Sequence, residues 1–490
     1  MKRRAGILMH ISSLPSNYGI GTFGKEAFKF VDFLNKTNQT YWQLLPIGPT
    51  SFGDSPYQSF SINAINPYFI DLDILIDEKL LKKEDIINSE YGKKINYGKL
   101  YKERYIVLRK AFNNFNLKDN NYLTFLNNHK HWVYDYANFM AIKKHFDDIS
   151  LLYWPNEIRK RDNDALKPLF LKLEKEINFE LFLQYKAYEQ FFKLKQYANS
   201  KNIKLIGDIP IYVSYDSSDV WMRPDLFMLD KDNKPTHVAG VPPDNFSKDG
   251  QLWGNPLYEW EKHREENFNW WIERIKMQTT MFDYIRIDHF IGFVNYFKIK
   301  ADEKTARNGV WEKALGKELF QEVYNRLGKL NIIAEDLGVI TDDVRKLLKD
   351  TNFPGMKLLQ FAFDSREESD YLPHNYTTNT VAYTGTHDNE TSKEWFSKLN
   401  KEDFKYALNY INAKEDENLV DALIKETLKS PSFIAIIPIQ DYLNLGPEGR
   451  MNIPSTLGNN WDFRIKKNYW TLELEKKISY FTKLYGRSKI

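Results

Sequence analysis

The sequence predicts a (β/α)8 barrel with large insertions after its second and third strands. Short apolar runs, each ending in polar or glycine-containing residues, recur eight times along the chain. Helical patterns lie between most of these runs, and acidic residues stand where several runs end. Strands that alternate with helices favour a parallel sheet, and eight such units favour closure into a barrel.

The eight predicted strands cover residues 5–13, 40–49, 203–213, 283–290, 330–338, 356–364, 379–389 and 433–441. The first run, AGILMHISS, follows a basic start and resembles the apolar part of a signal peptide. It is short, contains His10 and lacks a small-residue cleavage pattern. A first barrel strand is therefore the favoured interpretation.

Amphipathic patterns predict helices over residues 25–35, 317–328 and 341–350. In the second of these, one apolar stripe is formed by Leu319, Phe320, Val323 and Leu327. Gly328 suits the C-terminal end of that helix, and Thr341 suits the N-cap of the third.

Uneven spacing locates the insertions within a single catalytic barrel that spans residues 1–490. Roughly 150 residues separate the second strand from the third, far more than one helix requires. Aromatic residues interleave this Asn/Lys-rich stretch, so we expect a mainly helical subdomain over residues 60–200 rather than disorder. A second insertion, residues 214–280, contains HVAGVPPDNFSKDGQLWGNPLYEW and is expected to carry a lid over the active site.

Composition narrows the class of ligand and the compartment. Lys and Arg total 69 against 66 Asp and Glu, a balance that gives no general attraction to nucleic acid. Aromatic residues make up 15%, which leaves rings for a cleft that binds flat apolar faces such as those of sugars. The sequence has no cysteine, so disulfides and thiolate metal sites are excluded. No run approaches about 18 apolar residues, and we expect a soluble, cytoplasmic protein that does not associate with membranes.

Acidic residues gather at the predicted strand ends, where active sites of such barrels lie. The residues concerned are Asp208, Asp288, Glu335, Asp336, Asp364, His387 and Asp388. Taken alone, each of these carboxylates is compatible with a structural role in an ion pair or a helix cap. Several that converge on one rim repel each other, so their convergence indicates a functional site.

Such a cluster can bind a hard cation or carry out acid/base chemistry on a neutral substrate. The sequence contains no P-loop or glycine-rich phosphate fingerprint, and the aromatic residues favour sugars. Glycoside chemistry needs one carboxylate as nucleophile or base and one carboxylic acid to protonate the leaving oxygen. Asp288 and Glu335, on adjacent strands, fit that requirement.

The segment DYIRIDHF, residues 283–290, places Arg286 and Asp288 on one face of a strand and Ile285 and Ile287 on the other. An arginine beside a carboxylate is either a structural ion pair or a device that orients a catalytic group. These eight residues alone leave both interpretations open.

The motifs RIDHF around Asp288, AEDLG around Glu335 and TGTHDN around Asp388 resemble the catalytic motifs of the α-amylase superfamily. The chain also contains SPYQSFSINAINPYFIDL (55–72), GDIP (207–210), AGVPPDNFSKDGQLWGNPLYEW (239–260) and RMNIPST (450–456). Together these motifs resemble the 4-α-glucanotransferases called amylomaltase or disproportionating enzyme. The resemblance spans nearly the whole chain and is weakest in the Asn/Lys-rich insertion.

The resemblance implies Asp288 as nucleophile, Glu335 as general acid/base and Asp388 as transition-state stabiliser. Further substrate contacts are implied at Tyr57, Asp208, Trp253, Arg286, His289, Asp364, His387 and Asn452. The chemistry of the residues agrees, because Arg286 can hold Asp288 ionised and the apolar run before Glu335 favours a raised pKa. Asp336 points to the other face and is expected to be structural. A zinc site at His289 and His387 fits the residue types but is not favoured, and neither metal nor cofactor is expected.

The expected activity is retaining double displacement on α-1,4-glucans, with maltooligosaccharides as donor and acceptor. One alternative is an α-1,4-glucan hydrolase with the same three carboxylates, and another is a non-catalytic glucan-binding protein. The segment from Ala239 to Tyr258 is expected to be the lid, with Pro242 and Pro243 stiffening it, Gly250 and Gly254 permitting sharp turns and Trp253 covering the cleft. We expect a monomer or a homodimer.

Overall fold

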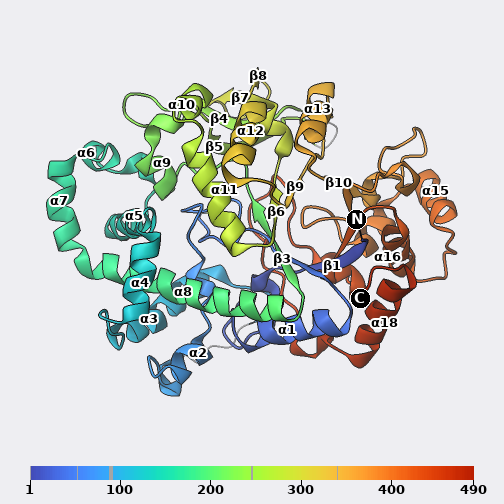
Figure 1. Ribbon diagram of the computed structural model, residues 1–490, viewed down its shortest axis with the longest axis horizontal. Helices are drawn as coiled ribbons and strands as arrows, with labels where there is room; N and C mark the ends of the chain where they lie inside the picture. The colour runs from blue at the N-terminus through green and yellow to red at the C-terminus, as the bar shows by residue number, and fades with distance from the viewer. Residues whose placement is uncertain (1, 52, 88–91, 244–246, 339, 490) are drawn as a thin grey trace.

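Eight parallel strands close into a barrel (Figure 1), which confirms the predicted fold class. The computed structural model describes residues 2–51, 53–87, 92–243, 247–338 and 340–489. The barrel strands are β1 (Arg4–Leu8), β2 (Tyr41–Gln43), β3 (Lys204–Ile209), β6 (Tyr284–Ile287), β9 (Ile332–Ala334), β10 (Gly355–Leu358), β11 (Thr380–Tyr383) and β12 (Ile434–Pro438). Each lies within or at the edge of one predicted run, and β1 pairs with β12 to close the sheet.

The barrel strands are buried on both faces, which explains their near-continuous apolar sequences. Every residue of β11 and β12 is buried, as is β1 from Ala5 onward. Side chains of the barrel pack inward on one another and outward on the helices, and the strands contribute to two large clusters of buried apolar residues.

Helices surround the barrel in the order of the chain. Those in contact with the strands or with each other around the ring are α1 (Lys25–Lys36), α8 (Glu174–Ser200), α11 (Asn269–Met281), α12 (Gly316–Leu327), α13 (Asp342–Thr351), α16 (Leu419–Lys429) and α18 (Leu472–Leu484). The predicted helices correspond to α1, α12 and α13. Thr341 caps α13 by accepting a hydrogen bond from the Val344 amide, and Gly328, at φ 71°, ends α12.

A helical layer lies at one end of the molecule, on the side opposite α15 and α16 in Figure 1. It consists of α2 (Leu72–Asp77), α3 (Tyr97–Asn113), α4 (Asn120–His129), α5 (Val133–His145), α6 (Asn156–Arg159), α7 (Asn163–Lys172) and the first part of α8. The 27-residue α8 connects this layer to the barrel, since it packs on α3, α4 and α5 and also on α1 and β3. The division of the chain at residues 60–200 and 214–280 stays a prediction.

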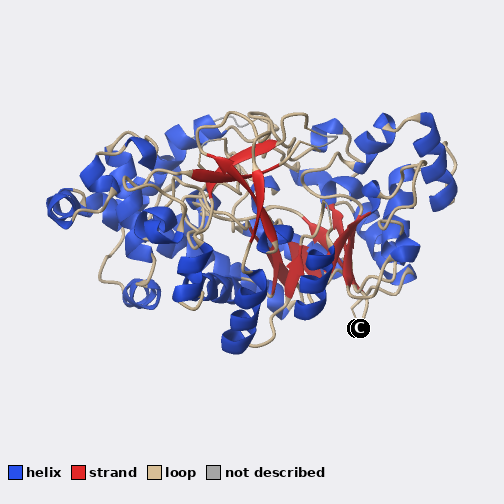
Figure 2. Ribbon diagram, turned by 90° about the horizontal axis from the view of Figure 1, so that it is seen from above, coloured by secondary structure: helices blue, strands red, loops and turns tan. Residues whose placement is uncertain are grey.

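A second, antiparallel sheet in the order β5-β4-β7-β8 stands beside the barrel (Figure 2). Its strands are β4 (His237–Val241), β5 (Gln251–Pro256), β7 (Asn295–Lys300) and β8 (Val310–Lys313). β4 and β5 come from the insertion after the third barrel strand, whereas β7 and β8 follow the fourth. The structure therefore adds a third inserted segment to the two that the sequence predicts.

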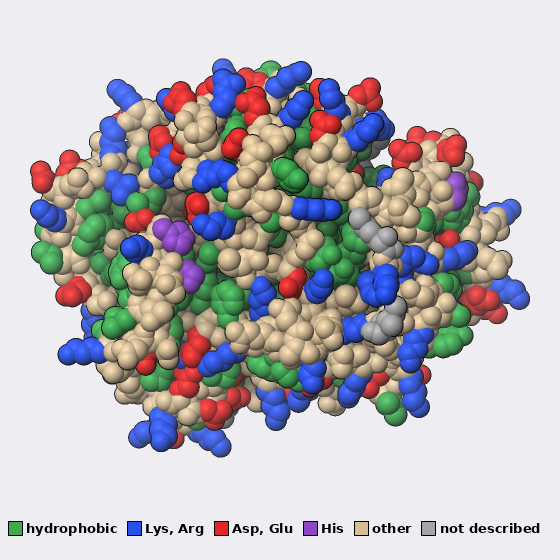
Figure 3. All heavy atoms as spheres, in the orientation of Figure 1, with side chains coloured by type: hydrophobic (Ala, Val, Ile, Leu, Met, Phe, Trp, Pro, Cys, Tyr) green, Lys and Arg blue, Asp and Glu red, His purple; other side chains and the backbone are tan. Residues whose placement is uncertain are grey.

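The remaining α-helices of the described residues are α9 (Ser218–Met222), α10 (Trp260–Glu265), α14 (Ser392–Lys398), α15 (Lys401–Ile411) and α17 (Ile439–Tyr442). Across the described residues, we find no helix whose length and apolarity would let it cross a membrane. Basic and acidic side chains are interspersed over the face shown in Figure 3, in keeping with the balance of 69 to 66 in the sequence.

Candidate active site

A buried arginine joins two neighbouring barrel strands. The strand register places Asp208 of β3 beside Arg286 of β6, and both residues are at most 4% exposed. Nη1 of Arg286 donates to both carboxylate oxygens of Asp208, at 2.8 and 2.7 Å. Nη2 lies 2.9 Å from Oδ1 of Asp288. Because a buried charge is tolerated only with partners, this arginine and its two carboxylates form one unit.

Arg286 is a permanent cation in this unit. Burial by itself lowers the pKa of a guanidinium, but Asp208 and Asp288 outweigh that effect and raise the pKa of Arg286 above its ordinary value. The direct contact holds the Asp288 carboxylate in one orientation beside a positive charge, as a carboxylate nucleophile requires.

Asp288 and Glu335 follow the ends of adjacent parallel strands. Ile287 of β6 pairs with Ala334 of β9, so the next residues along each strand are Asp288 and Glu335. The Glu335 amide donates to the Ile287 carbonyl at 3.0 Å. The two carboxyl groups are therefore carried by neighbouring strands of one sheet.

Glu335 is buried and its environment favours the protonated form. Burial and the negative charge of Asp288 raise the pKa of Glu335 to about 8, although Arg286 and two backbone amides act in the opposite direction. Those amides belong to His289, 2.6 Å from Oε2, and Leu337, 2.8 Å from Oε1. They fix the carboxyl in place. At neutral pH this group can therefore deliver a proton, whereas an ordinary glutamate cannot.

Asp388 lies in the loop after β11, with its side chain 44% exposed. Oδ2 lies 3.2 Å from Nε2 of His387, and Oδ1 accepts a hydrogen bond of 2.6 Å from Nδ2 of Asn452. Burial of its surroundings raises the pKa of Asp388, but the charge of His387 and hydrogen bonds from His387 and Asn452 outweigh this and lower it to about 2. Asp388 therefore remains a carboxylate at the entrance to the site.

Tyr57 connects the carboxylate unit to the Asp388 loop. Its hydroxyl donates to Oδ2 of Asp208 at 2.8 Å, and its ring is stacked on His387 with centroids 5.2 Å apart and planes 14° from parallel. Trp461 packs against both rings, at 5.8 Å from each. Tyr57, His387 and Trp461 thus form one aromatic surface beside the carboxylates of Asp208 and Asp388.

Trp253 and His289 form a second aromatic contact, next to Asp288. Their rings are edge-to-face at 4.9 Å, and Tyr212 packs near both. His289 adopts a left-handed conformation, at φ 51°, which turns the chain sharply after Asp288. Burial lowers the pKa of His289 to about 4, against a smaller effect of Asp288, so this imidazole is neutral and can both donate and accept hydrogen bonds.

A groove of about 490 Å³ leads away from these residues. Trp253 and Gly254 line one part of it, and Asn452, Leu457 and Trp461 line another. Residues of the segment from Ala239 to Tyr258 and of the loop after β12 therefore line one opening.

The side chain of Asp364 is paired with a residue outside this arrangement. It follows β10 and forms a bidentate pair with Arg366, whose Nε lies 2.8 Å and Nη2 2.5 Å from the two carboxylate oxygens. The hydrogen bonds from Arg366 lower the pKa of Asp364 to about 2. None of its hydrogen bonds or ion pairs within the described residues reaches another predicted site residue, so its role stays a prediction.

Two further observations complete the site. Asp336 accepts a hydrogen bond from the Met356 amide at 2.7 Å, which connects β9 to β10 and fits the predicted structural role. The described part of the chain contains no group of three or more His, Asp or Glu side chains arranged to hold a metal ion.

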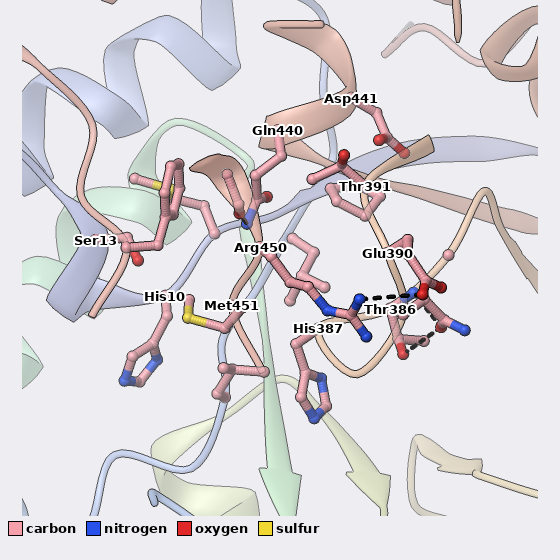
Figure 4. A pocket seen from close by; sticks show the side chains of 18 residues that line it. His10, Ser13, Thr386, His387, Glu390, Thr391, Gln440, Asp441, Arg450 and Met451 are labelled. Carbon is pink, nitrogen blue, oxygen red and sulfur yellow. Dashed lines mark hydrogen bonds and ion pairs between the residues drawn. The ribbon is translucent and has the colours of Figure 1, made fainter. Parts of the chain in front are cut away.

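The sequence interpretation missed three residues that the structure brings into this region. Trp461 packs on Tyr57, while Arg450 and Glu390 form an ion pair of 3.0 Å behind the Asp388 loop (Figure 4). Arg450 opens the RMNIPST motif and Glu390 follows Asp388 by two residues. Both residues stand two positions from a predicted site residue, Arg450 from Asn452 and Glu390 from Asp388, and this closeness in the sequence could have indicated them. Nothing in the sequence singles out Trp461.

A parallel barrel with two carboxylates at the ends of neighbouring strands, one of them buried and protonated, is typical of enzymes that act on glycosidic bonds. A family model described as 4-alpha-glucanotransferase matches residues 9–469, and the chain belongs to this family.

Similar proteins agree over the full length. A 4-alpha-glucanotransferase of Clostridium butyricum is 49% identical over 485 residues, which cover 98% of this chain and 100% of the relative. A 4-alpha-glucanotransferase of Streptococcus pneumoniae is 45% identical over 495 residues, 99% of this chain and 98% of the relative. The structure of an amylomaltase from Streptococcus agalactiae in complex with acarbose is 46% identical, superposes with a TM-score of 0.97, and the match covers 100% of both chains.

Proposed function

We propose that this chain transfers segments of α-1,4-glucans to the 4-hydroxyl of an acceptor glucan or glucose by retaining double displacement. Asp288 is the nucleophile, Glu335 the general acid/base and Asp388 the transition-state stabiliser. Membership of the 4-alpha-glucanotransferase family supports this activity and does not favour a hydrolase or a non-catalytic binding protein.

One observation carries the assignment of roles. Asp288 contacts the Arg286 guanidinium, while Glu335 on the neighbouring strand has a pKa raised to about 8 by burial and by Asp288. A retaining mechanism needs a carboxylate nucleophile next to a carboxyl group that can donate a proton.

In the first half-reaction, Glu335 donates its proton to the glycosidic oxygen as Asp288 attacks the anomeric carbon. The bond from that carbon to the leaving oxygen breaks, the shortened glucan departs with the proton, and a β-linked glucosyl ester forms on Asp288. The ionised Asp388, beside Asn452 and His387, lies where it can interact with the hydroxyls of a sugar that carries positive charge in the transition state.

In the second half-reaction, the Glu335 carboxylate removes the proton from the 4-hydroxyl of the acceptor. The acceptor oxygen attacks the anomeric carbon, the ester to Asp288 breaks, and both carboxyl groups return to their initial states. Two inversions at the same carbon retain the α configuration.

Transfer requires strong discrimination against water. Water at about 55 M competes with an acceptor at about 1 mM, so transfer dominates only if it is favoured by more than about 5 × 10⁴, or about 6 kcal/mol. An aromatic wall alone does not provide this factor. The acceptor must be held over the intermediate while water is excluded or badly aligned.

We assign this task to the lid segment from Ala239 to Tyr258, of which residues 244–246 lie outside the described residues. β4 and β5 of this segment pair with each other and place Trp253 against His289, next to the nucleophile. Gly250, at φ 68°, allows the turn between these strands, because a Cβ there would lie 2.4 Å from the Val241 carbonyl oxygen. Gly254, at φ 77°, lies within strand β5, beside a register shift in its pairing with β4.

Substrate contacts follow from the same geometry. We propose that Tyr57 and Trp253 contact sugar faces, that His289, His387 and Asn452 bind hydroxyls, and that Asp208 and Arg286 hold the nucleophile. Asp364, paired with Arg366, is proposed as a contact further along the glucan. Maltooligosaccharides serve as donor and acceptor, and the predicted cytoplasmic location and monomeric or homodimeric state remain proposals.

Trapping of the intermediate tests the assignment. The wild-type enzyme is mixed with a 5-fluoro-glucosyl fluoride, and intact mass and peptide mapping identify the labelled residue. A covalent glucosyl adduct on Asp288 that fails to form in Asp288→Asn is expected. An adduct on Glu335 or Asp388 overturns the assignment.

A further inference from the structure

Arg450 lies between two loops that meet at Asp388. One is the loop after β11, which carries His387, Asp388 and Glu390. The other, after β12, carries Asn452, which donates to Asp388 at 2.6 Å. Nη1 of Arg450 donates to Oε1 of Glu390 at 3.0 Å, and Nε donates to the carbonyl oxygen of Asn452 at 3.1 Å. The same guanidinium therefore touches both loops.

Glu390, the acidic partner of Arg450, lies beside two further charged residues, Glu394 and Lys398. Oε1 of Glu394, on α14, lies 3.5 Å from Nη1 of Arg450, and Lys398 contacts both Glu390 and Glu394, at 3.2 and 2.6 Å. The Arg450 side chain is only 15% exposed and that of Glu394 only 8%. Figure 4 shows Arg450 extended toward Glu390, with His387 below Arg450 in the view and Asp441 above it.

The geometry of the guanidinium group explains why an arginine occupies position 450. Its planar group presents donors in fixed directions, so one face can bind a carboxylate while Nε reaches a carbonyl. A lysine offers one charged nitrogen and cannot hold both partners in these positions. Partial shielding from solvent also makes this pair stronger than an exposed one.

The loop that carries Asn452 does not need Arg450 in order to keep its own shape. The Trp461 amide donates to the Met451 carbonyl at 2.7 Å and closes the base of the loop. Within it, the Ile453 amide donates to Oδ1 of Asn460 at 3.0 Å, and Nδ2 of Asn460 donates to the Thr456 carbonyl at 3.1 Å. Loss of Arg450 therefore changes where the loop sits relative to Asp388, rather than whether it folds.

We propose that Arg450, paired with Glu390, is a positioning residue for catalysis: it holds Asn452 against Asp388 so that this carboxylate keeps one orientation during transfer. The inference rests on the proposed role of Asp388. A misplacement of about 1 Å in a catalytic group can lower a rate about a hundredfold, so a contact that touches no substrate can control turnover.

The test compares Arg450→Met, Arg450→Lys, Glu390→Gln, Asn452→Ala and the double variant Arg450→Met/Asn452→Ala. Glucose release from maltotriose gives kcat and KM for each. The matched control is Arg223→Met, which removes an ion pair of 2.8 Å to Glu266 away from the site. Thermal unfolding of all variants shows whether they remain folded, and Glu390→Gln gives a second route to the answer if an Arg450 variant does not.

Arg450→Met is expected to lower kcat by about ten- to a hundredfold and to leave KM nearly unchanged, with Arg450→Lys intermediate. Because Arg450 acts through Asn452, the double variant should be no slower than the slower single variant. The proposal is wrong if Arg450→Met and Glu390→Gln match Arg223→Met, or if the two losses simply multiply.

Asp388→Asn separates this inference from the proposed function. If that variant is inactive while the Arg450 and Glu390 variants behave like the control, only the positioning role fails. If Asp388→Asn retains wild-type turnover, the assigned role of Asp388 fails and the inference fails with it.

Discussion

Nη2 of Arg286, on strand β6, lies 2.9 Å from Oδ1 of Asp288, the residue that follows the strand. The other terminal nitrogen of this guanidinium is bound to the fully buried carboxylate of Asp208. The guanidinium therefore satisfies a buried charge inside the barrel and holds the carboxylate of Asp288 in one orientation.

Arg286→Met should destabilise the fold. The substitution leaves the buried Asp208 without its ionic partner, and breaking such a pair typically costs about 3–5 kcal/mol. Urea unfolding monitored by fluorescence measures the change. Arg223→Met, which breaks a partly exposed pair, serves as the control and is expected to lose about 1 kcal/mol or less. Equal losses of unfolding free energy in the two variants would show that the buried Arg286–Asp208 pair contributes no more stability than the partly exposed pair.

Glu335→Gln should separate donors by their leaving groups. Without a proton donor, cleavage of maltotriose is expected to slow by about a hundredfold or more, whereas α-glucosyl fluoride needs little protonation and should form the intermediate nearly as fast as in wild type. Pre-steady-state fluoride release measures that step. Similar losses on both donors would assign Glu335 another task.

The pKa of Glu335 predicts an alkaline limit to activity. Turnover of maltotriose requires the protonated carboxyl, so kcat/KM should fall as pH rises through about 8. A pH profile from 5 to 10 in buffers of constant ionic strength gives the apparent pKa. An alkaline limb that persists unchanged in Glu335→Gln would belong to a different group.

The same group makes stability depend on pH. A carboxyl whose folded pKa is raised from 4.5 to about 8 contributes stability that is fully present below 4.5 and is lost as pH rises toward 8. Glu335→Gln does not titrate. Its melting temperature should therefore exceed that of wild type by an amount that grows between pH 4.5 and 8 and then levels off. Calorimetry that finds a constant difference across this range contradicts the assigned environment.

Trp253→Ala should increase hydrolysis relative to transfer. The indole covers the nucleophile side of the site against His289, and its removal admits water to the intermediate. The ratio of new reducing ends to glucose released from maltotriose measures the change. Trp311→Ala, a half-exposed tryptophan on β8 of the same sheet, is the control. A ratio that stays at the wild-type value in Trp253→Ala would show that Trp253 does not exclude water from the intermediate.

The barrel could be predicted because its strands are short apolar runs buried on both faces, with helices between them. Thr341 and Gly328 marked helix ends correctly, since capping depends on local residue chemistry. The sheet of β4, β5, β7 and β8 was missed. Its strands pair between segments separated by a barrel strand, and β8 contributes only four residues, VWEK, without an apolar run.

In the candidate site, too, some residues could be recognised from the sequence and others could not. Asp288 and Glu335 were recognisable because each follows an apolar strand, and the register of β6 and β9 brings them together. Arg450 and Glu390 lie 60 residues apart in the sequence, and only the arrangement of the two loops joins them. The partner of Asp364, Arg366, is two residues away in the sequence, yet the motifs did not indicate that this pair would form.

The central claim is that the glucosyl intermediate is passed to another glucan. Incubation of the enzyme with maltotriose alone, with chain lengths followed by chromatography and total reducing ends by a copper assay, tests it most directly. Transfer predicts free glucose and longer maltodextrins while the number of reducing ends stays constant. Reducing ends that rise in step with the loss of maltotriose would show that water resolves the intermediate and would contradict the account.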